Sequence, residues 1–298
     1  MMKKWIKIII LSFLALMLLP ACMHSSEDQL KAFDQHMKIV NEKERILSKT
    51  LNQMDLNQIH YLSQTDTTDK NKQAFNDIKK AIDQKLKPKF KDYKEEANQL
   101  PARDDTLKAL KSTYLKGIDQ KEHEIKQLDS FIALCQKSIQ SNEKILDSTQ
   151  AFEKNRSRVE SQMNLAKQTE QGSRENEMLE NKLISNNQAI KEIAEKSMNA
   201  KSEKAQLDAI HKEMLPLIQG QIKELNKTQL KDSATNNARQ NAIEMYYKLE
   251  RYYQERAKTI QYSEKLSKFD VNQLVTKGDD LERFDQPFEK EKRKLESK

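Results

Sequence analysis

Apolar residues recur along this chain at alternating steps of three and four, which is the spacing of a helix that faces a partner helix. The first apolar stripe runs from Leu30 to Met54, and only Glu44 interrupts it. A polar stretch at residues 63–69 follows. The pattern therefore predicts a helix over most of residues 30–54 that buries one face against other helices.

Two further stripes follow the polar stretch. One covers residues 75–100, with Pro88 as the site of a predicted kink and Pro101 as its stop. The next begins near Asp104 and keeps heptad steps, with Asn142 at its one polar position. Its clearest apolar positions are Ile125, Leu128, Ile132, Cys135, Ile139 and Leu146. Amphipathic helices joined by short connections bury such stripes by packing antiparallel.

The second half of the chain continues the helical pattern less regularly. The periodicity thins over residues 151–202, with a predicted bend at residues 171–173. A stripe then continues to residue 225 with Pro216 inside it, and the last strong helix covers residues 238–268. An interior proline costs about 3 kcal/mol, so the pattern alone does not decide whether the helix continues through Pro216.

No run of alternating β-branched residues indicates a strand. We therefore predict an all-α fold, an elongated antiparallel helical bundle with coiled-coil-like long helices over residues 30–288. The bundle is either one body or two sub-bundles, 30–150 and 151–288. Residues 289–298 are predicted to form a charged, frayed tail.

The composition narrows the classes of function. The chain carries 53 Lys plus Arg and 46 Asp plus Glu, a net charge of +7, and three of the lysines lie in the first 21 residues, which hold no acid. Without that segment the net charge is +4, which argues against a nucleic-acid partner. The 4 glycines stand far apart, so no phosphate-binding loop is predicted.

The N-terminus has the pattern of an exported lipoprotein. Residues 1–7 are basic, and residues 8–19 are apolar except for Ser12, a run shorter than the roughly 20 residues of a membrane-spanning helix. The sequence Leu-Pro-Ala-Cys that ends at Cys22 resembles the lipobox of bacterial lipoproteins. We predict a signal peptide at residues 1–21, a lipid anchor on Cys22 and a short tether over residues 22–29. An ordinary secretory signal with a chance cysteine, or an uncleaved anchor, are the alternatives.

Catalytic and metal-binding patterns are missing from the sequence. The five histidines are scattered, so no metal site and no cofactor are predicted. Neither a Gly-x-Ser-x-Gly motif nor a cysteine beside an activating histidine occurs. Cys135 lies on an apolar stripe, where a small buried side chain or a reactive thiol would fit. We predict that the protein is not an enzyme.

The most distinctive segment is Glu244–Arg256, where tyrosines and arginines gather on one predicted helix. One interpretation is a helix wedged between two neighbours, with phenol groups hydrogen-bonded at the edge of the core. The other is an exposed aromatic and arginine platform for a glycan, a peptide or a partner helix. The candidate interaction patch consists of Tyr246, Tyr247, Arg251, Tyr252, Tyr253 and Arg256.

The tetrapeptide Glu-Met-Tyr-Tyr at residues 244–247 resembles the motif of the EMYY-motif lipoproteins of staphylococci and their relatives. The signal, the lipobox and the polar helical body are also similar to the YkyA-like lipoproteins, a group described as cell-wall-binding. The resemblance implies a membrane-anchored, surface-exposed protein of a Gram-positive cell, and it brings no catalytic residues with it.

These features favour a non-enzymatic lipoprotein on the extracytoplasmic face of the cell membrane that binds a wall polymer or another envelope protein. The alternative is a cell-wall hydrolase with paired acids in an interhelical cleft. The substrate-binding component of a transporter would be a two-lobed α/β protein, and the sequence shows no βαβ pattern.

Overall fold

A computed structural model describes residues 26–297 of the chain, and these residues form helices and connections without a strand. The predicted all-α fold is confirmed. The predicted signal peptide and Cys22 lie outside the described residues. Among the helices that the structure describes, none combines the length and the apolar character needed to cross a membrane.

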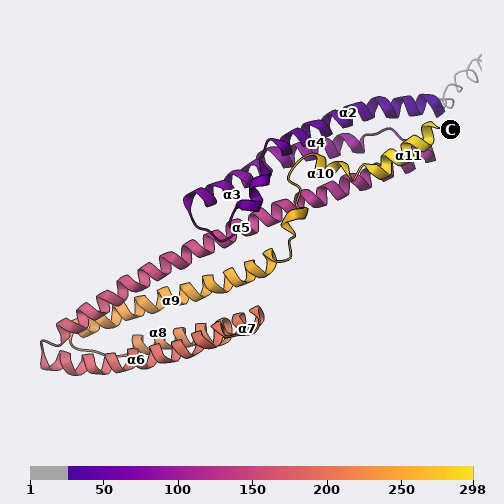
Figure 1. The fold of residues 1–298 in the computed structure, drawn as a ribbon. Helices are drawn as coiled ribbons and strands as arrows, with labels where there is room; N and C mark the ends of the chain where they lie inside the picture. Colours follow the sequence, from indigo (N-terminus) through magenta and orange to yellow (C-terminus); the bar gives the residue numbers. More distant parts are fainter. Residues whose placement is uncertain (1–25, 298) are drawn as a thin grey trace, which may run out of the picture. The chain divides into compact units, whose positions relative to one another are not determined.

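The long elements are all α-helices, and Figure 1 shows their course. They are α2 (Ser26–Asn52), α3 (Asp69–Ala81), α4 (Lys87–Asn98), α5 (Asp105–Ala166), α6 (Glu170–Met198), α8 (Leu215–Lys227), α9 (Ser233–Leu266) and α11 (Gln286–Glu296). The short elements are α7 (Glu203–Asp208), α10 (Asp279–Glu282), the 3₁₀ turns η1 (Leu56–Tyr61) and η4 (Val271–Gln273), and the π-helices η2 (Ile82–Leu86) and η3 (Ala209–Met214).

The described residues group into two compact units. Unit 1 comprises residues 26–57, 80–127 and 275–297, and unit 2 comprises residues 58–79 and 128–274. This grouping differs from a division at residue 150. The C-terminal segment packs with the first helices of the chain, and most of α3 packs with the second part of α5, so the units interleave along the sequence.

Unit 1 packs α2, α4, the first part of α5 and the C-terminal segment around one apolar core. The helices α2 and α4 run antiparallel, with His36 Nε2 3.0 Å from the Glu96 carboxylate. The buried side chains of this core include Phe33, Val40, Leu47, Phe90, Leu110 and Phe288. Each of these helices packs the apolar stripe that its sequence predicts against the other helices of unit 1.

The C-terminal segment corrects the prediction of a frayed tail. Residues 286–296 form the helix α11, in which Phe288 is 2% exposed and its ring centroid lies 4.7 Å from that of Tyr114. The Lys292 ammonium pairs with Asp34 at 2.8 Å. One buried aromatic ring and one ion pair thus hold a segment whose charge density suggested fraying.

The tether prediction also changes in part. The helix α2 already includes residues 26–29, which the sequence assigned to the tether. Its first turn holds Glu27 and Asp28. Acidic side chains favour that position because the N-terminal end of a helix carries a partial positive charge.

Unit 2 packs α6, α8 and α9 with the second part of α5. The helices α6 and α8 run antiparallel: Lys196 near the end of α6 pairs with Glu213 on η3, directly before α8, and Gln221 Nε2 on α8 donates to the Asn186 carbonyl oxygen at 3.1 Å. The core of this unit includes Val159, Leu179, Leu183, Met214, Ile218, Leu225, Ala242 and Tyr246. These side chains come from all four helices, so the unit buries each helix on one face.

The helix α3 lies along α5 in unit 2, where Lys72 Nζ pairs with Glu143 at 2.7 Å. The predicted stripe on α5 is buried from Ile125 to Ile139, but Leu146 is 52% exposed. Because α3 begins near Glu143 and runs back along α5, Leu146 lies beyond the end of its partner. The expectation that Leu146 belongs to the buried stripe was wrong for this reason.

Both prolines inside the predicted stripes follow a π-helical turn. The π-helix η2 precedes Pro88 and the π-helix η3 precedes Pro216, and each proline stands in the first turn of the next α-helix. Proline lacks an N–H group and its ring crowds the preceding turn, so a wider turn accommodates it. The chain therefore stays helical through Pro216, from Glu203 to Lys227.

Candidate functional site: a buried lysine cluster and a polar hollow on helix α9

The Glu-Met-Tyr-Tyr tetrapeptide lies half in the core of unit 2 and half on its surface. Met245 and Tyr246 are 4% and 0% exposed, whereas Tyr247 is 45% exposed. The Tyr246 hydroxyl donates to Asn187 Oδ1 at 3.2 Å, and burial raises the pKa of Tyr246 to about 12. Tyr246 is thus a core residue with a satisfied hydroxyl, and it is not available to an exposed patch.

Glu255 ties the same stretch of α9 to α5. It is 5% exposed, and it accepts hydrogen bonds from Ser141 Oγ at 2.9 Å and from Lys258 Nζ at 2.8 Å. Burial acts to raise the pKa of Glu255, but the hydrogen bonds from Lys258 and Ser141 outweigh it and hold this pKa below its ordinary value. The carboxylate is therefore charged, paired and turned away from solvent.

The remaining residues of the candidate patch lie toward the surface of α9. Tyr252 and Tyr253 are half-buried, and their rings meet edge to face with centroids 5.0 Å apart. Arg251 and Arg256 are exposed. Burial raises the pKa of Tyr253 to about 12. The structure thus brings Tyr252, Tyr253 and Arg256 together, while Tyr247 and Arg251 stand apart from that group.

Two hollows in unit 2 meet at Arg256, and we call the larger one the polar hollow. The polar hollow has a volume of about 450 Å³ and is lined by Gln64, Thr65, Ser138, Asn142, Glu203, Gln206, Arg256, Thr259, Ile260, Ser263 and Leu266. The smaller hollow, of about 120 Å³, contains Tyr252 and Tyr253 and shares Gln206, Arg256 and Ile260 with it. Volumes of roughly 300–1,000 Å³ are typical of small-molecule pockets.

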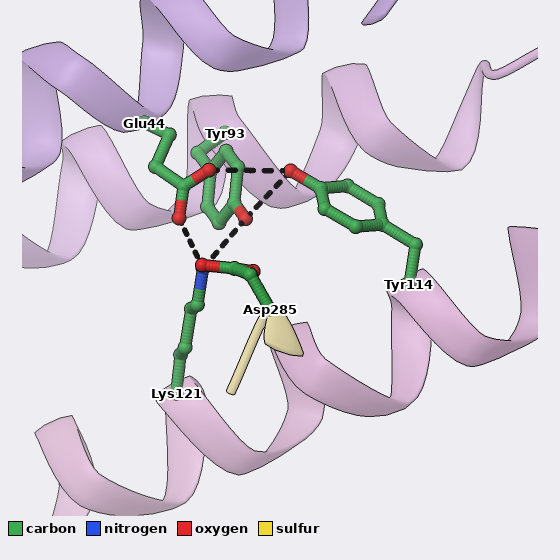
Figure 2. Close-up of polar contacts among 5 residues, drawn as sticks. All are labelled: Glu44, Tyr93, Tyr114, Lys121 and Asp285. Atoms are coloured by element: carbon green, nitrogen blue, oxygen red, sulfur yellow. Dashed lines mark hydrogen bonds and ion pairs between the residues drawn. The ribbon is translucent and has the colours of Figure 1, made fainter. Parts of the chain in front are cut away.

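A different site lies in the core of unit 1, where Lys121 is completely buried. Its ammonium contacts both Asp285 oxygens at 2.6 Å, pairs with the Glu44 carboxylate and donates to the Tyr93 hydroxyl at 3.3 Å. The Tyr93 and Tyr114 hydroxyls are 2.9 Å apart. Figure 2 shows these five side chains pointing toward one another. We call them the lysine cluster.

Each member of the lysine cluster comes from a segment that the fold must bring together. Glu44 lies on α2, Tyr93 on α4, Tyr114 and Lys121 on α5, and Asp285 directly before α11. Two carboxylates around one ammonium leave an excess of one negative charge in a buried place when both acids are ionised. Such a site costs several kcal/mol in desolvation unless geometry and hydrogen bonds offset it.

The electrostatics of the lysine cluster favour a neutral acid at one position. Burial, together with the nearby charge of Glu44, raises the pKa of Asp285 to about 7 against the opposing attraction of Lys121. Burial also raises the pKa of Tyr93 and that of Tyr114, so both phenols stay protonated. The cluster therefore favours a protonated Asp285 at pH values below about 7.

The paired acids of the lysine cluster bear on the hydrolase alternative. A glycosidase needs two carboxyl groups on opposite sides of a bond in an open cleft. Here both carboxylates contact the same ammonium, and their side chains are only 22% and 19% exposed. Asp285 borders a hollow formed by residues 282–294 alone, and Glu44 does not line it. This geometry holds helices together more readily than it flanks a substrate.

The sequence held partial signals of the lysine cluster. Glu44 is the polar interruption of the first stripe, and Tyr93 and Tyr114 stand on the second and third stripes. Lys121 and Asp285 gave no signal, because one of many lysines on a helix suggests a solvated face. Their separation along the chain by 164 positions also hides the pairing.

The structure describes one of the two cysteines. Cys135 is free and completely buried, and burial raises the pKa of its thiol to about 12. It therefore acts as a small apolar side chain and not as a reactive thiol. Cys22 lies outside the described residues. Within residues 26–297, no group of three or more potential metal ligands is placed to hold an ion.

The protein is all-α, and the residues of α5 belong partly to unit 1 and partly to unit 2. The family model of the EMYY-motif containing lipoproteins matches residues 2–296, so the chain belongs to this family. Family membership indicates that the protein is attached to a membrane through a lipid. No curated protein and no solved structure matches the chain.

Proposed function

We propose that this lipoprotein lies on the extracytoplasmic face of the cell membrane of a Gram-positive cell and binds an envelope component without converting it. The ligand is a wall polymer or another envelope protein. The observation that supports this proposal most is the polar hollow of unit 2, where exposed Arg256 stands between two hollows beside a pair of tyrosines. Arginine and tyrosine are enriched where proteins bind partners.

Binding without turnover is favoured by the residues of the polar hollow. Its lining includes one carboxylate, Glu203, together with amides and hydroxyls. Hydrolysis of a glycosidic bond uses two carboxyl groups, one to protonate the leaving oxygen and one to activate water or attack the sugar. The hollow offers groups that orient a ligand and lacks the second acid, so recognition is the activity that its chemistry supports.

The proposal is tested with the full chain purified in detergent micelles and mixed with purified cell walls. We expect the protein to sediment with the walls, to be released progressively by added salt, and to set free no soluble wall fragments over hours. Protease treatment of intact cells should remove the protein. Release of soluble fragments would favour the hydrolase. Absence of wall binding, combined with protection from external protease, would overturn the proposal.

A further inference from the structure

We propose that the polar hollow of unit 2 binds a polyhydroxylated ligand that carries one negative charge, and that Arg256 pairs with this charge. This inference rests on the proposed function and names the class of ligand. The anionic group is a carboxylate on a sugar or a phosphate on a polyol, and both chemistries ask for the same arrangement of donors and acceptors.

The lining of the polar hollow matches a ligand rich in hydroxyl groups. It contains three side-chain amides (Gln64, Asn142 and Gln206) and four hydroxyls (Thr65, Ser138, Thr259 and Ser263). Amides and hydroxyls both donate and accept hydrogen bonds. Sugar hydroxyls do the same, so a lining of this kind can satisfy them without a charged group at each contact. These side chains come from four separate segments of the chain, which lets them surround a ligand.

Arg256 supplies the one free cation of this lining. Among the described residues, no carboxylate lies within ion-pairing distance of its guanidinium, and its side chain is exposed. Arg45, Arg156 and Arg174 pair with acids on their own helices, and Arg156 contacts Glu153 at 2.8 Å and Glu160 at 2.6 Å. Among the described residues Arg251 is exposed without such a pair as well, but it lines neither hollow. A guanidinium binds a carboxylate or a phosphate through two parallel hydrogen bonds. Because Arg256 is unpaired and also lines both hollows, its position favours an anionic partner there.

The acid next to Arg256 in the sequence is engaged elsewhere and does not pair with it. Glu255, the adjacent residue, is buried and bonded to Ser141 and Lys258. Its ion pairs are with Lys144 and Lys258, and Glu203, the acid of the hollow lining, makes no ion pair with Arg256 either among the described residues. Tyr252 and Ile260, four residues before and after Arg256, carry no charge. The sequence around this position thus leaves the positive charge exposed at the rim of the hollow.

The walls of the polar hollow are held before any ligand arrives. Asn142 Nδ2 donates to the Thr65 carbonyl oxygen at 3.2 Å and fastens the loop of residues 64–65 to α5. The helix α7 is capped by Ser202, whose hydroxyl accepts from the Ala205 N–H at 3.2 Å. Preformed walls lower the cost of ordering side chains on binding. Asn142, the one polar position of the third stripe, therefore has a structural reason to be polar.

The smaller hollow adds an aromatic surface that suits one face of a sugar ring. The edge-to-face pair of Tyr252 and Tyr253 lies beside Arg256 in the smaller hollow. Aromatic side chains with a polar end suit ligands that are apolar on one face and hydroxylated at the edge. The two hollows together thus present hydroxyl partners, one cation, one carboxylate at Glu203 and an aromatic surface.

The experiment titrates the full chain in detergent micelles with three probes, followed by calorimetry or NMR. N-acetylglucosamine is neutral, N-acetylmuramic acid is the same ring with a carboxylate, and glycerol 3-phosphate is a polyol phosphate. We expect at least one anionic probe to bind about tenfold or more tightly than the neutral sugar. Which anion binds identifies the source of the charge.

Two variants make the assignment specific. Arg256→Gln should raise the Kd of the anionic probe by about tenfold or more, because a charge-assisted hydrogen bond is lost. Arg251→Gln is the matched control, since Arg251 is exposed on the same helix but does not line either hollow. It should bind as the unsubstituted chain does. Both positions are exposed, so both variants should keep the melting temperature of the parent.

Three results would overturn the inference: no binding of any probe, equal binding of the neutral and anionic probes, or unchanged binding by Arg256→Gln. The wall-sedimentation assay separates this failure from failure of the proposed function. If Arg256→Gln still sediments with walls as the parent does, the proposed function stands and the hollow is not the site. If the parent chain binds neither walls nor probes, both fail.

Discussion

At the scale of single residues, Lys121 has the environment least expected of a lysine. Its ammonium is fully buried and contacts two carboxylates and a phenol. Removing a charge from water costs several kcal/mol, and the pairings must offset that cost. Because the partners come from α2, α4 and the segment before α11, the ammonium favours only the arrangement in which all of these segments meet.

Replacement of the buried ammonium gives the first prediction. Lys121→Met leaves the carboxylates of Glu44 and Asp285 buried without a cation, and removing one partner of a buried ion pair costs about 3–5 kcal/mol. Urea unfolding followed by circular dichroism measures this loss. Lys116→Met, at an exposed position of α5, is the control and should change stability by less than about 0.5 kcal/mol. Equal effects of the two variants would contradict the role of Lys121.

The raised pKa of Asp285 gives a prediction about pH. Its folded-state pKa of about 7 lies above its ordinary value of 3.8. Between these values the folded chain keeps a proton that the unfolded chain has lost, so the stabilisation by this group is complete at low pH and disappears as the pH rises through 7. The stability advantage of the parent over Asp285→Asn should fall by roughly 1–3 kcal/mol between about pH 4.5 and pH 8.

Paired chemical unfolding of the parent and Asp285→Asn across this range checks the sign. The amide does not titrate, so the difference between the two proteins isolates the carboxyl group. A difference that grows with rising pH would show that the folded-state pKa is lowered. It would then contradict the raised pKa of Asp285.

At the scale of elements, two glycines test how closely the segments pack. A Cβ added to Gly117 on α5 would lie 2.6 Å from the carbonyl oxygen of Phe284, in the C-terminal segment of unit 1. A Cβ added to Gly220 on α8 would meet nothing within 4 Å. Both residues are helical, so alanine improves the local helix in each case and only the surroundings differ.

Opposite results are therefore expected from the same substitution. Gly220→Ala should stabilise the protein by roughly 0.5–1 kcal/mol, because alanine loses less backbone entropy in a helix. Gly117→Ala should destabilise it by roughly 1–3 kcal/mol, since the backbone of residue 284 must shift. Thermal melts of the two variants compare them directly. Stabilisation by Gly117→Ala would mean that the C-terminal segment does not pack against α5 as described.

The apolar stripes predicted most of the helical elements, because period and burial are linked locally. They could not predict that the contact between α3 and α5 extends along α5 only as far as Glu143, which leaves Leu146 exposed. They also missed the helix α11, whose charged composition outweighed its single buried ring at Phe288. Pro88 predicted a kink and Pro216 left the continuity of its helix open, but nothing in the apolar period specified the π-helical turns that precede them.

The candidate sites were less accessible to sequence reasoning, since each depends on residues that are distant along the chain. The tyrosine and arginine segment was identifiable, but the pattern did not decide that Tyr246 would be buried while Arg256 would be exposed. The polar hollow adds Gln64, Ser138 and Gln206, which are ordinary polar residues in the sequence. Only the packing of unit 2 brings them to Arg256.

At the scale of the whole molecule, membership of a lipoprotein family indicates attachment to a membrane through a lipid. The sequence Leu-Pro-Ala-Cys predicts Cys22 as the attachment point. Each CH₂ group of an acyl chain that is buried in a bilayer contributes about 0.8 kcal/mol, and two or more chains hold a protein stably at the membrane. Cys22→Ala should therefore abolish incorporation of a labelled fatty acid. Cys135→Ala is the control, since that thiol is buried in unit 2, and it should keep the label. Labelling of Cys22→Ala would place the lipid elsewhere.

The most direct test of the account places a photoreactive amino acid at Ser263, an exposed residue of the polar hollow, in living cells. The control position is Gln254, which is exposed on the same helix and does not line the hollow. After irradiation, we expect mass spectrometry to identify an anionic wall polymer fragment, a sugar acid or a polyol phosphate, on residue 263 and not on residue 254. Equal crosslinking at both positions, or crosslinks from residue 263 to cytosolic molecules alone, would contradict recognition at this hollow on the outer face of the membrane.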